Sequence, residues 1–248
     1  MMRMQEDYDA TAFSKKFLFY YCIMIRMKEV TVNWPKNDAK ALEERALDIV
    51  RVLKDVIKLE KYPELTITIH GTRKSYDEAL YKQSEPWEVG TATRDHNIHI
   101  LHPDAFEKYS THNKSEFDGV LKHEVVHIFI GELSGNSYIP HWLNEGLANY
   151  LSHQGSDSQG SPYFIEQSFT SRLSSGRDWN SRIHDGAYAI SRSFTKYLVD
   201  HYSLEKVLGL VKSLDRNFYE PVFREKFKQQ FGVELSEVEN NFALGHNS

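Results

Sequence analysis

The sequence predicts an α+β fold in which a small sheet precedes a helical region. Apolar and polar residues alternate with the period of a half-buried strand in three short segments, at 30–34, 65–70 and 97–101. Apolar residues at helical spacing separate the first two segments, from about Asp38 to Glu60. Beyond Lys114 the alternation stops and every periodic stretch is helical. We therefore expect a small mixed sheet with helices, followed by a helical lobe.

Three parts are expected along the chain. Residues 1–27 form an N-terminal extension, residues 28–154 a sheet lobe with the site helices, and residues 155–248 a helical lobe that completes the same unit. The stretch Gly155–Pro162 is rich in Gly, Ser and Asp, which predicts a loop where the lobes meet. The helices expected in the last lobe cover residues 184–202, 204–214, 222–231 and 235–242.

Composition narrows the class of partner. The chain has 248 residues, with 30 basic and 35 acidic side chains and a formal charge of -5, and it contains no run of basic residues. This charge pattern argues against nucleic acid as a partner. The single cysteine, Cys22, excludes an internal disulfide and fits a reducing compartment, so a cytoplasmic location is expected. Nothing in the sequence indicates an oligomeric state.

The apolar segment Phe17–Ile25 has two interpretations. It follows Lys15 and Lys16 as the core of an export signal would, but no small-x-small cleavage site follows it. It is too short to cross a bilayer, so no stable membrane span is expected. The segment is either a buried strand or packing segment, or an uncleaved export or anchoring signal within residues 15–25.

A pair of histidines has the spacing of metal ligands. His123-Glu124-Val125-Val126-His127 is an HExxH motif, whose two imidazoles share one face when the motif lies on a helix. The two histidines could then bind one ion together. Glu124 projects beside that face and could reach a metal-bound water without binding the metal, which is the position of a general base.

The flanking residues predict the helix that the motif needs. Ser115 and Asp118 have the spacing of a capping box, and apolar positions at helical spacing continue from about Glu116 to Ile130. The following stretch, Gly131–Ile139, is predicted to be a loop that lets a second helix fold back on the first.

Glu145 is the best candidate for a third ligand. A catalytic zinc ion takes three protein ligands and keeps one position open. Pro140 is placed at a helix start and Gly155 ends the run, so Glu145 lies on a second helix with Trp142 on the same side and His141 off that side. Gly146 and Ala148 are small, which would let the two helices approach closely.

Two segments resemble a known family. HEVVHIFIGEL (residues 123–133) and WLNEGLANY (residues 142–150) are similar to the paired motifs of the gluzincin metallopeptidases, especially the aminopeptidase-N-like branch and reduced, peptidase-MA-like domains. The resemblance implies a thermolysin-like zincin fold that acts on a peptide or protein. It also implies one Zn²⁺ ion per chain with His123, His127 and Glu145 as ligands, and Glu124 as the general base.

The resemblance also suggests two supporting residues. Asn149, one turn after Glu145, could hold a ligating imidazole in its tautomer, or it is a plain polar helix residue. Tyr188 resembles the tyrosine that related gluzincins bring from the helical lobe to stabilise the negative oxygen, or it is ordinary helix packing.

Two further questions follow from the motifs. A non-catalytic zinc-binding or interaction module derived from a peptidase would need the three ligands but not Glu124, so the presence of Glu124 favours an enzyme. The segment Gly90–Arg94 is the counterpart of the segment with which aminopeptidases hold the substrate amino terminus, but it lacks their glutamate. We therefore expect an endopeptidase or oligopeptidase in place of a strict aminopeptidase.

Overall fold

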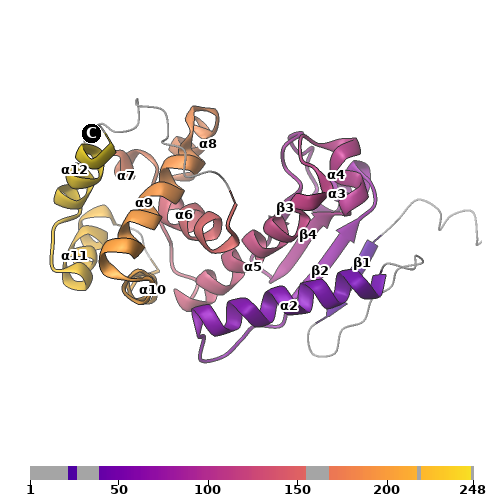
Figure 1. Ribbon diagram of the computed structural model, residues 1–248, viewed down its shortest axis with the longest axis horizontal. Helices are drawn as coiled ribbons and strands as arrows, with labels where there is room; N and C mark the ends of the chain where they lie inside the picture. The colour runs from indigo at the N-terminus through magenta and orange to yellow at the C-terminus, as the bar shows by residue number, and fades with distance from the viewer. Residues whose placement is uncertain (1–21, 27–38, 155–167, 217–218, 247–248) are drawn as a thin grey trace, which may run out of the picture.

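The structure, a computed structural model, describes residues 22–26, 39–154, 168–216 and 219–246. It confirms the α+β class: a sheet lobe and a helical lobe lie side by side, and α5 runs between them (Figure 1). In chain order the elements are β1 (Cys22–Arg26), α2 (Ala39–Ile57), β2 (Thr66–His70), α3 (Arg73–Leu80), β3 (Gly90–Ala92), β4 (Asn97–Leu101), α4 (Pro103–Tyr109), η2 (Lys114–Glu116), α5 (Phe117–Leu133), α6 (His141–Ser152), α7 (Phe169–Arg172), α8 (Gly176–Asn180), η4 (Ile183–Asp185), α9 (Ala187–Tyr202), α10 (Leu204–Lys212), α11 (Glu220–Phe231) and α12 (Leu235–His246).

The sheet is small and mixed. Its order is β1-β2-β4-β3, with β2 and β4 parallel and both outer strands antiparallel to their neighbours. β1 begins at Cys22, so from that residue on the apolar segment is a strand, and the sheet includes part of the predicted extension. Residues 15–21 and the strand expected at 30–34 lie outside the described residues. None of the described helices is both long and apolar enough to cross a membrane.

One face of the sheet packs on the helix that carries the HExxH motif. In the β3–β4 pair, Gly90 lies opposite Ile100 and Ala92 opposite Ile98, so all four residues point the same way. A Cβ atom on Gly90 would lie 2.7 Å from Cγ1 of Val120 in α5. Only glycine lets the edge strand come this close to the helix.

The opposite face of the sheet carries a polar network under α3. His70 and His99 lie on this face, and their ring nitrogens Nε2 and Nδ1 are 3.0 Å apart. The hydroxyl of Tyr76, in α3, hydrogen-bonds to Oγ1 of Thr91 over 2.7 Å. The alternation of the strands thus separates a polar side under α3 from the apolar side against α5.

The start of α5 differs from the expected cap. The reciprocal bonds of a capping box join Asn113 and Glu116 at the start of η2, and Ser115 and Asp118 do not form the box. Glu116 accepts a hydrogen bond from the Asn113 backbone at 3.0 Å, and the η2 turn leads directly into α5. The helix then runs to Leu133, beyond the Ile130 expected from the sequence.

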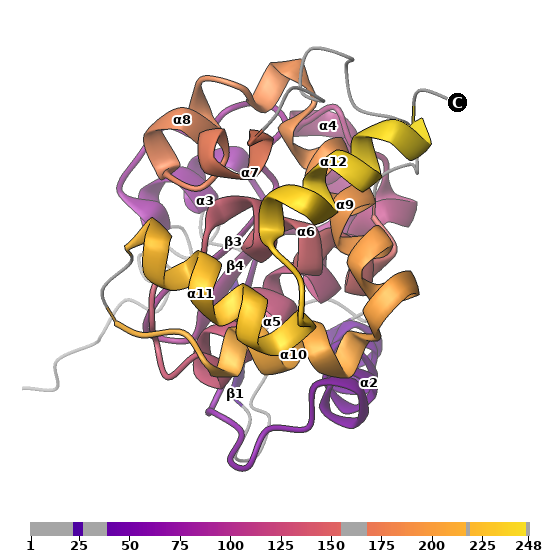
Figure 2. The same ribbon diagram turned by 90° about the vertical axis from the view of Figure 1, so that its left-hand side faces the viewer.

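The helical lobe is built around α6. Trp142 is fully buried there and packs against Phe194 of α9 and Phe223 of α11, with ring centroids 5.3 and 6.1 Å away. Figure 2 shows α9, α11 and α12 stacked over α6 on the side away from the sheet. Trp142 therefore anchors the lobe. The prediction that it lies on the metal side of α6 was wrong, because it points into the helical lobe.

Gly146 sets the distance between α6 and α9. The prediction had been that it lets α5 and α6 approach closely, but the atoms nearest to it belong to α9. A Cβ atom on this residue would lie 2.6 Å from the carbonyl oxygen of Ser191 and would also overlap Oγ1 of Thr195. The backbone oxygen cannot rotate away, so the close approach of α9 depends on the glycine. Because Gly146 follows Glu145 directly, this contact also fixes where the carboxylate stands.

We predict that Gly146→Ala lowers the free energy of unfolding by about 1–3 kcal/mol, because the added methyl group overpacks the α6–α9 contact. Gly131→Ala is the matched control: it too lies in a helix, but its Cβ would meet only Oδ1 of Asn136 at 3.9 Å. There the change should raise stability by up to about 1 kcal/mol, since alanine favours the helix. Denaturant titration measures both, and equal stability of the two variants would contradict the close-packing account.

Candidate metal centre

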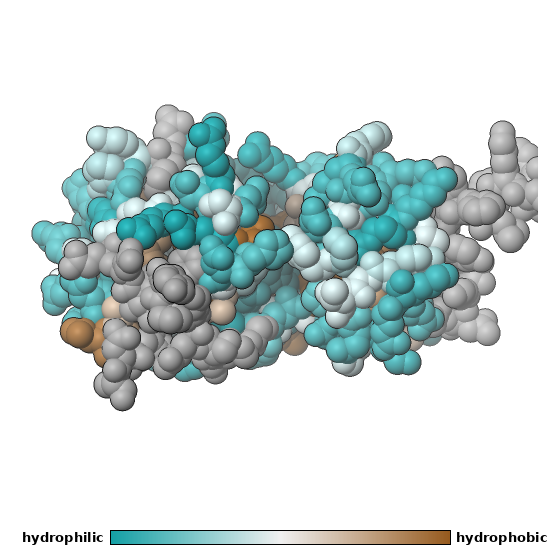
Figure 3. Space-filling view, turned by 90° about the horizontal axis from the view of Figure 1, so that it is seen from above, coloured by the Kyte–Doolittle hydropathy of each residue, from teal (hydrophilic) through white to brown (hydrophobic). Residues whose placement is uncertain are grey.

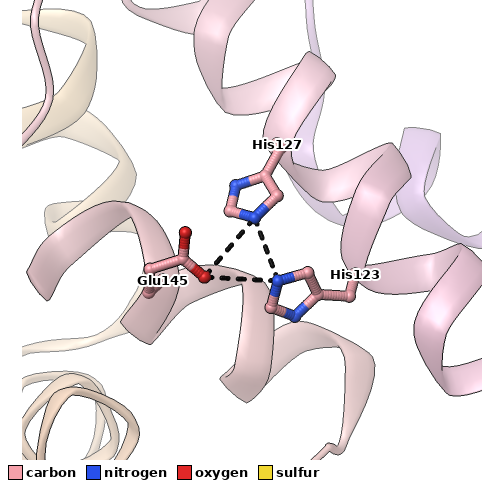
Figure 4. A group of neighbouring side chains, drawn as sticks. All are labelled: His123, His127 and Glu145. Carbon is pink, nitrogen blue, oxygen red and sulfur yellow. Dashed lines mark hydrogen bonds and ion pairs between the residues drawn. The ribbon is translucent and has the colours of Figure 1, made fainter. Parts of the chain in front are cut away.

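Three side chains from α5 and α6 converge on one point (Figure 4). The Nε2 atoms of His123 and His127 are 2.9 Å apart, and Oε2 of Glu145 lies 3.3 Å from the first and 3.6 Å from the second. Ligands about 2.0–2.1 Å from a tetrahedral ion stand roughly 3.3 Å apart. The three donor atoms therefore already have the spacing that a single metal ion requires.

The electrostatics of the group also favour a cation. Burial would lower the pKa of His127, but the carboxylates of Glu145 and Glu124 outweigh it and raise the pKa to about 9. Burial would raise the pKa of Glu145, yet the positive charge of His127 and hydrogen bonds from both imidazoles hold it well below its usual range. Without a metal, a proton thus balances the buried carboxylate, and a divalent ion could take its place.

The orientation of His127 depends on a residue that the sequence analysis missed. Oδ1 of Asn144 lies 3.2 Å from Nδ1 of His127, so the amide can accept the ring proton and leave Nε2 free for a metal. Asn144 immediately precedes Glu145 within WLNEG, and this adjacency was the available signal. The predicted supporting residue, Asn149, is buried and lines the same cavity. No hydrogen bond is recorded between Asn149 and either histidine, so its role stays a prediction.

Glu124 is held by the edge of the sheet. It is 8% exposed, and its Oε2 accepts a hydrogen bond of 2.7 Å from the backbone N–H of Ala92 in β3. Its side chain also lies against Gly90, where a Cβ would stand 3.1 Å from its Cγ and Oε1. Glu124 does not belong to the converging triad, and its role as a base stays a prediction.

An aromatic cluster of the helical lobe adjoins the triad. Tyr188 of α9 lines the same cavity and packs edge-on against Trp179 of α8, with ring centroids 5.0 Å apart. Burial and the charges of Glu145 and Glu124 raise the pKa of the Tyr188 phenol well above its usual value, so the hydroxyl keeps its proton. His141, which was expected to lie off the side that carries Glu145, is partly buried, lines the same cavity and stacks on Trp179 with ring centroids 6.1 Å apart.

These residues line one cavity of about 1370 Å³ between the two lobes. In the view from above, the surface is mostly hydrophilic over both lobes and is recessed between them (Figure 3). All three residues of β3 lie along the cavity wall, as do five histidines outside the triad: His96, His112, His141, His153 and His184.

The comparison with known families agrees with this geometry. A family model described as the peptidase MA superfamily matches residues 46–243, which span most of the chain from α2 to α12 and contain all the residues of the triad. A search of curated proteins and a search of solved structures found no match. On the strength of the family model, the chain belongs to the peptidase MA superfamily.

Proposed function

We propose that the chain is a zinc-dependent metallopeptidase of the gluzincin type that hydrolyses peptide bonds. The observation that carries the proposal is the convergence of two Nε2 atoms and one carboxylate oxygen beside a separately held glutamate. Two imidazoles and one carboxylate are a donor set found in catalytic zinc sites, and three protein ligands leave one position open. A thermolysin-like arrangement of the two lobes around the site belongs to the same proposal.

Glu124 also favours an enzyme over the alternative, a non-catalytic zinc-binding or interaction module. Such a module needs His123, His127 and Glu145 alone. It has no use for a buried carboxylate held next to them by a backbone N–H of a different element.

In the proposed mechanism Glu124 moves the protons. A zinc ion bound at the triad would lower the pKa of its water and polarise the scissile carbonyl. Glu124 takes the proton from the attacking water and delivers it to the leaving amine. The Ala92 N–H directs the carboxylate from the cleft wall, so the base is oriented before substrate arrives.

Tyr188 is the proposed donor to the oxygen that becomes negatively charged. The pKa of its phenol is raised well above its usual value, so the hydroxyl keeps its proton near neutral pH, and its ring lines the cavity. A donor of this kind, fixed before the reaction, stabilises the transition state more than the substrate.

The substrate is proposed to bind as an added strand along β3. This strand forms one of the two edges of the sheet, is only partly buried, and lies along the cavity that contains the triad. An extended peptide placed there gains main-chain hydrogen bonds, and its alternate side chains point into the cleft.

The charges near β3 support an endopeptidase or oligopeptidase. An aminopeptidase needs a free carboxylate close to the site to hold the substrate's ammonium group. Glu88, just before β3, is paired with Lys82 and also accepts a hydrogen bond from Thr91. Asp95 is engaged by Thr93 and Asn97, and neither Asp95 nor Asp185 is among the residues that line the cavity.

We predict that Glu124→Gln keeps about one zinc ion per chain but loses most hydrolysis, about 100-fold or more, because the change removes a base and no ligand. Glu145→Ala is the control that removes a ligand and should lose most of its zinc. Metal analysis of the purified proteins and cleavage of a quenched peptide library measure the two effects. Loss of zinc from Glu124→Gln would contradict the division between base and ligands.

Asn144→Ala should weaken zinc binding by about 10–100-fold, since the His127 imidazole loses the acceptor that fixes its tautomer. The same substitution at Asn149 tests the second supporting residue, which is on the same helix and is more deeply buried than Asn144. Competition with a chromophoric chelator gives both affinities. Zinc affinity equal to that of the unmodified chain in Asn144→Ala would show that the bond does not orient the ligand.

Matched peptides with free and acetylated amino termini should be cleaved at similar rates, at bonds several residues from either end. The reason is that Lys82 already pairs with Glu88, the acidic residue that stands just before β3 in the sequence and lines the cavity. Mass spectrometry of the products locates the bonds cut. A strong preference for the free amine would show that an acidic residue does anchor the terminus.

A further inference from the structure

The turn that joins β3 to β4 is tight and has Arg94 at its corner. The backbone N–H of His96 donates to the carbonyl oxygen of Thr93 over 3.1 Å, and that of Thr93 donates to the carbonyl oxygen of Asn97 over 2.8 Å. His96 has a positive φ of 60°, as the last residue of such a three-residue hairpin loop does. Arg94 is the first central residue of the turn, so its backbone is held from both sides.

The turn lies beside the part of α5 that carries the second histidine of the triad. β3 and α5 pack side by side (Figure 1). At the end of β3, the N–H of Ala92 donates to Glu124. Farther along the chain, Nε2 of His96 lies 2.9 Å from Oε1 of Glu132. Arg94 is between these two contacts in the sequence, so the turn follows α5 past the triad.

The carboxylates of this turn and of the helix beside it already have partners. Asp95, the next residue after Arg94, accepts hydrogen bonds from the side chains two residues before and two residues after it. Glu132 is paired with His96. Arg94 itself is exposed, and none of the described residues forms a hydrogen bond or an ion pair with it. Its guanidinium is therefore left without a counter-charge from these two carboxylates.

The charges of the cavity wall are distributed unevenly along β3. Glu85 and Glu88 line the cavity before the strand, where Lys82 pairs with Glu88. Arg94 lines the cavity after the strand. Lys82 and Arg94 are the lysine and the arginine of the described wall, and only Arg94 has no partner among the described residues. The cleft thus offers an unneutralised positive charge at the end of β3 that leads into the turn.

A peptide bound along β3 would pass within reach of this charge. A strand advances about 3.3 Å per residue, so Arg94 lies about 7 Å along the chain from Ala92, whose N–H holds the proposed base. A guanidinium binds a carboxylate through two parallel N–H donors. The cavity lining continues along α5 to Gly131 and on to Asn136, so the substrate chain can extend past the triad at this end. This favours an acidic side chain over a terminal carboxylate as the group that Arg94 binds.

We propose that Arg94 selects peptides with an Asp or Glu side chain close to the scissile bond, through an ion pair between its guanidinium and that carboxylate. The inference rests on the proposed function and names the class of peptide that the site accepts. Arg94 binds substrate and takes no part in the proton transfers. Because the pair would form equally in the bound substrate and in the transition state, it should lower KM and leave kcat unchanged.

Matched quenched peptides test the inference. One peptide that the unmodified chain cleaves is varied to Glu or to Gln, one position at a time, over three residues on each side of the bond cut. At the best position Glu should give a KM about fivefold lower than Gln, the upper range for a pair that stays partly in water. Arg94→Gln should remove this preference. Arg177→Gln is the matched control, an exposed arginine of α8 outside the cavity lining, and should keep it.

Two further arms identify the group that is recognised. Arg94→Glu should reverse the preference, so that Lys at the same position is favoured over Gln. Peptides with free and amidated carboxyl termini should have equal KM values if the side chain is the ligand. A preference for the free terminus without one for Glu would overturn the assignment to an acidic side chain. Equal KM for Glu and Gln peptides, or an unchanged preference in Arg94→Gln, would overturn the inference.

A binding measurement separates this inference from the proposed function. Zinc-loaded Glu124→Gln should bind a fluorescent Glu peptide about fivefold more tightly than its Gln counterpart, as measured by anisotropy. Adding Arg94→Gln to that variant should make the two affinities equal. Equal affinities without Arg94→Gln would overturn the inference. Absence of cleavage by the unmodified, zinc-loaded chain, with the binding preference intact, would instead overturn the proposed function alone.

Discussion

The structure depends on bringing one buried carboxylate next to two imidazoles. Charged groups in a protein interior are stable together only when opposite charge or a metal compensates them. The crossing of α5 and α6 supplies that compensation, since it places Glu145 within 3.6 Å of both histidine nitrogens. Two residues of α6 help to hold this crossing in place. Trp142 anchors α6 in the helical lobe, and Gly146 allows α9 to pack closely against α6. The cleft between the lobes exists because each lobe is packed on one of these two helices.

Much of this could be predicted from sequence because the decisive signals are local. The spacing of His123 and His127 on one helix, and a proline that starts the next, needed no knowledge of the tertiary structure. For the same reason β4 and most helices of the last lobe lie close to their predicted bounds. The short helices α3, α4, α7 and α8 were not predicted, because four to eight residues are too few to show a helical period.

The wrong predictions concern which face of a helix points inward and which distant residues it contacts. Both depend on the tertiary structure. Helix α6 is buried on nearly every side, so its periodicity does not identify one inward face. Trp142 was therefore assigned to the metal side and His141 off it, whereas Trp142 packs into the helical lobe and His141 lines the cavity. The link between Asn144 and His127 depends on the angle at which two helices cross, and the bond from Ala92 to Glu124 joins residues 32 positions apart. No local pattern contains such information.

The candidate metal centre is complete only when distant parts of the chain have packed together. Here the local part of the site, the two histidines and Glu124 on α5, is incomplete by itself. Glu145 joins it only when α6 docks, and Glu124 is aligned only when the β3–β4 hairpin settles against α5. Contacts between distant residues form late, because closing the intervening loops costs entropy first. Local opening of either lobe would separate these groups again.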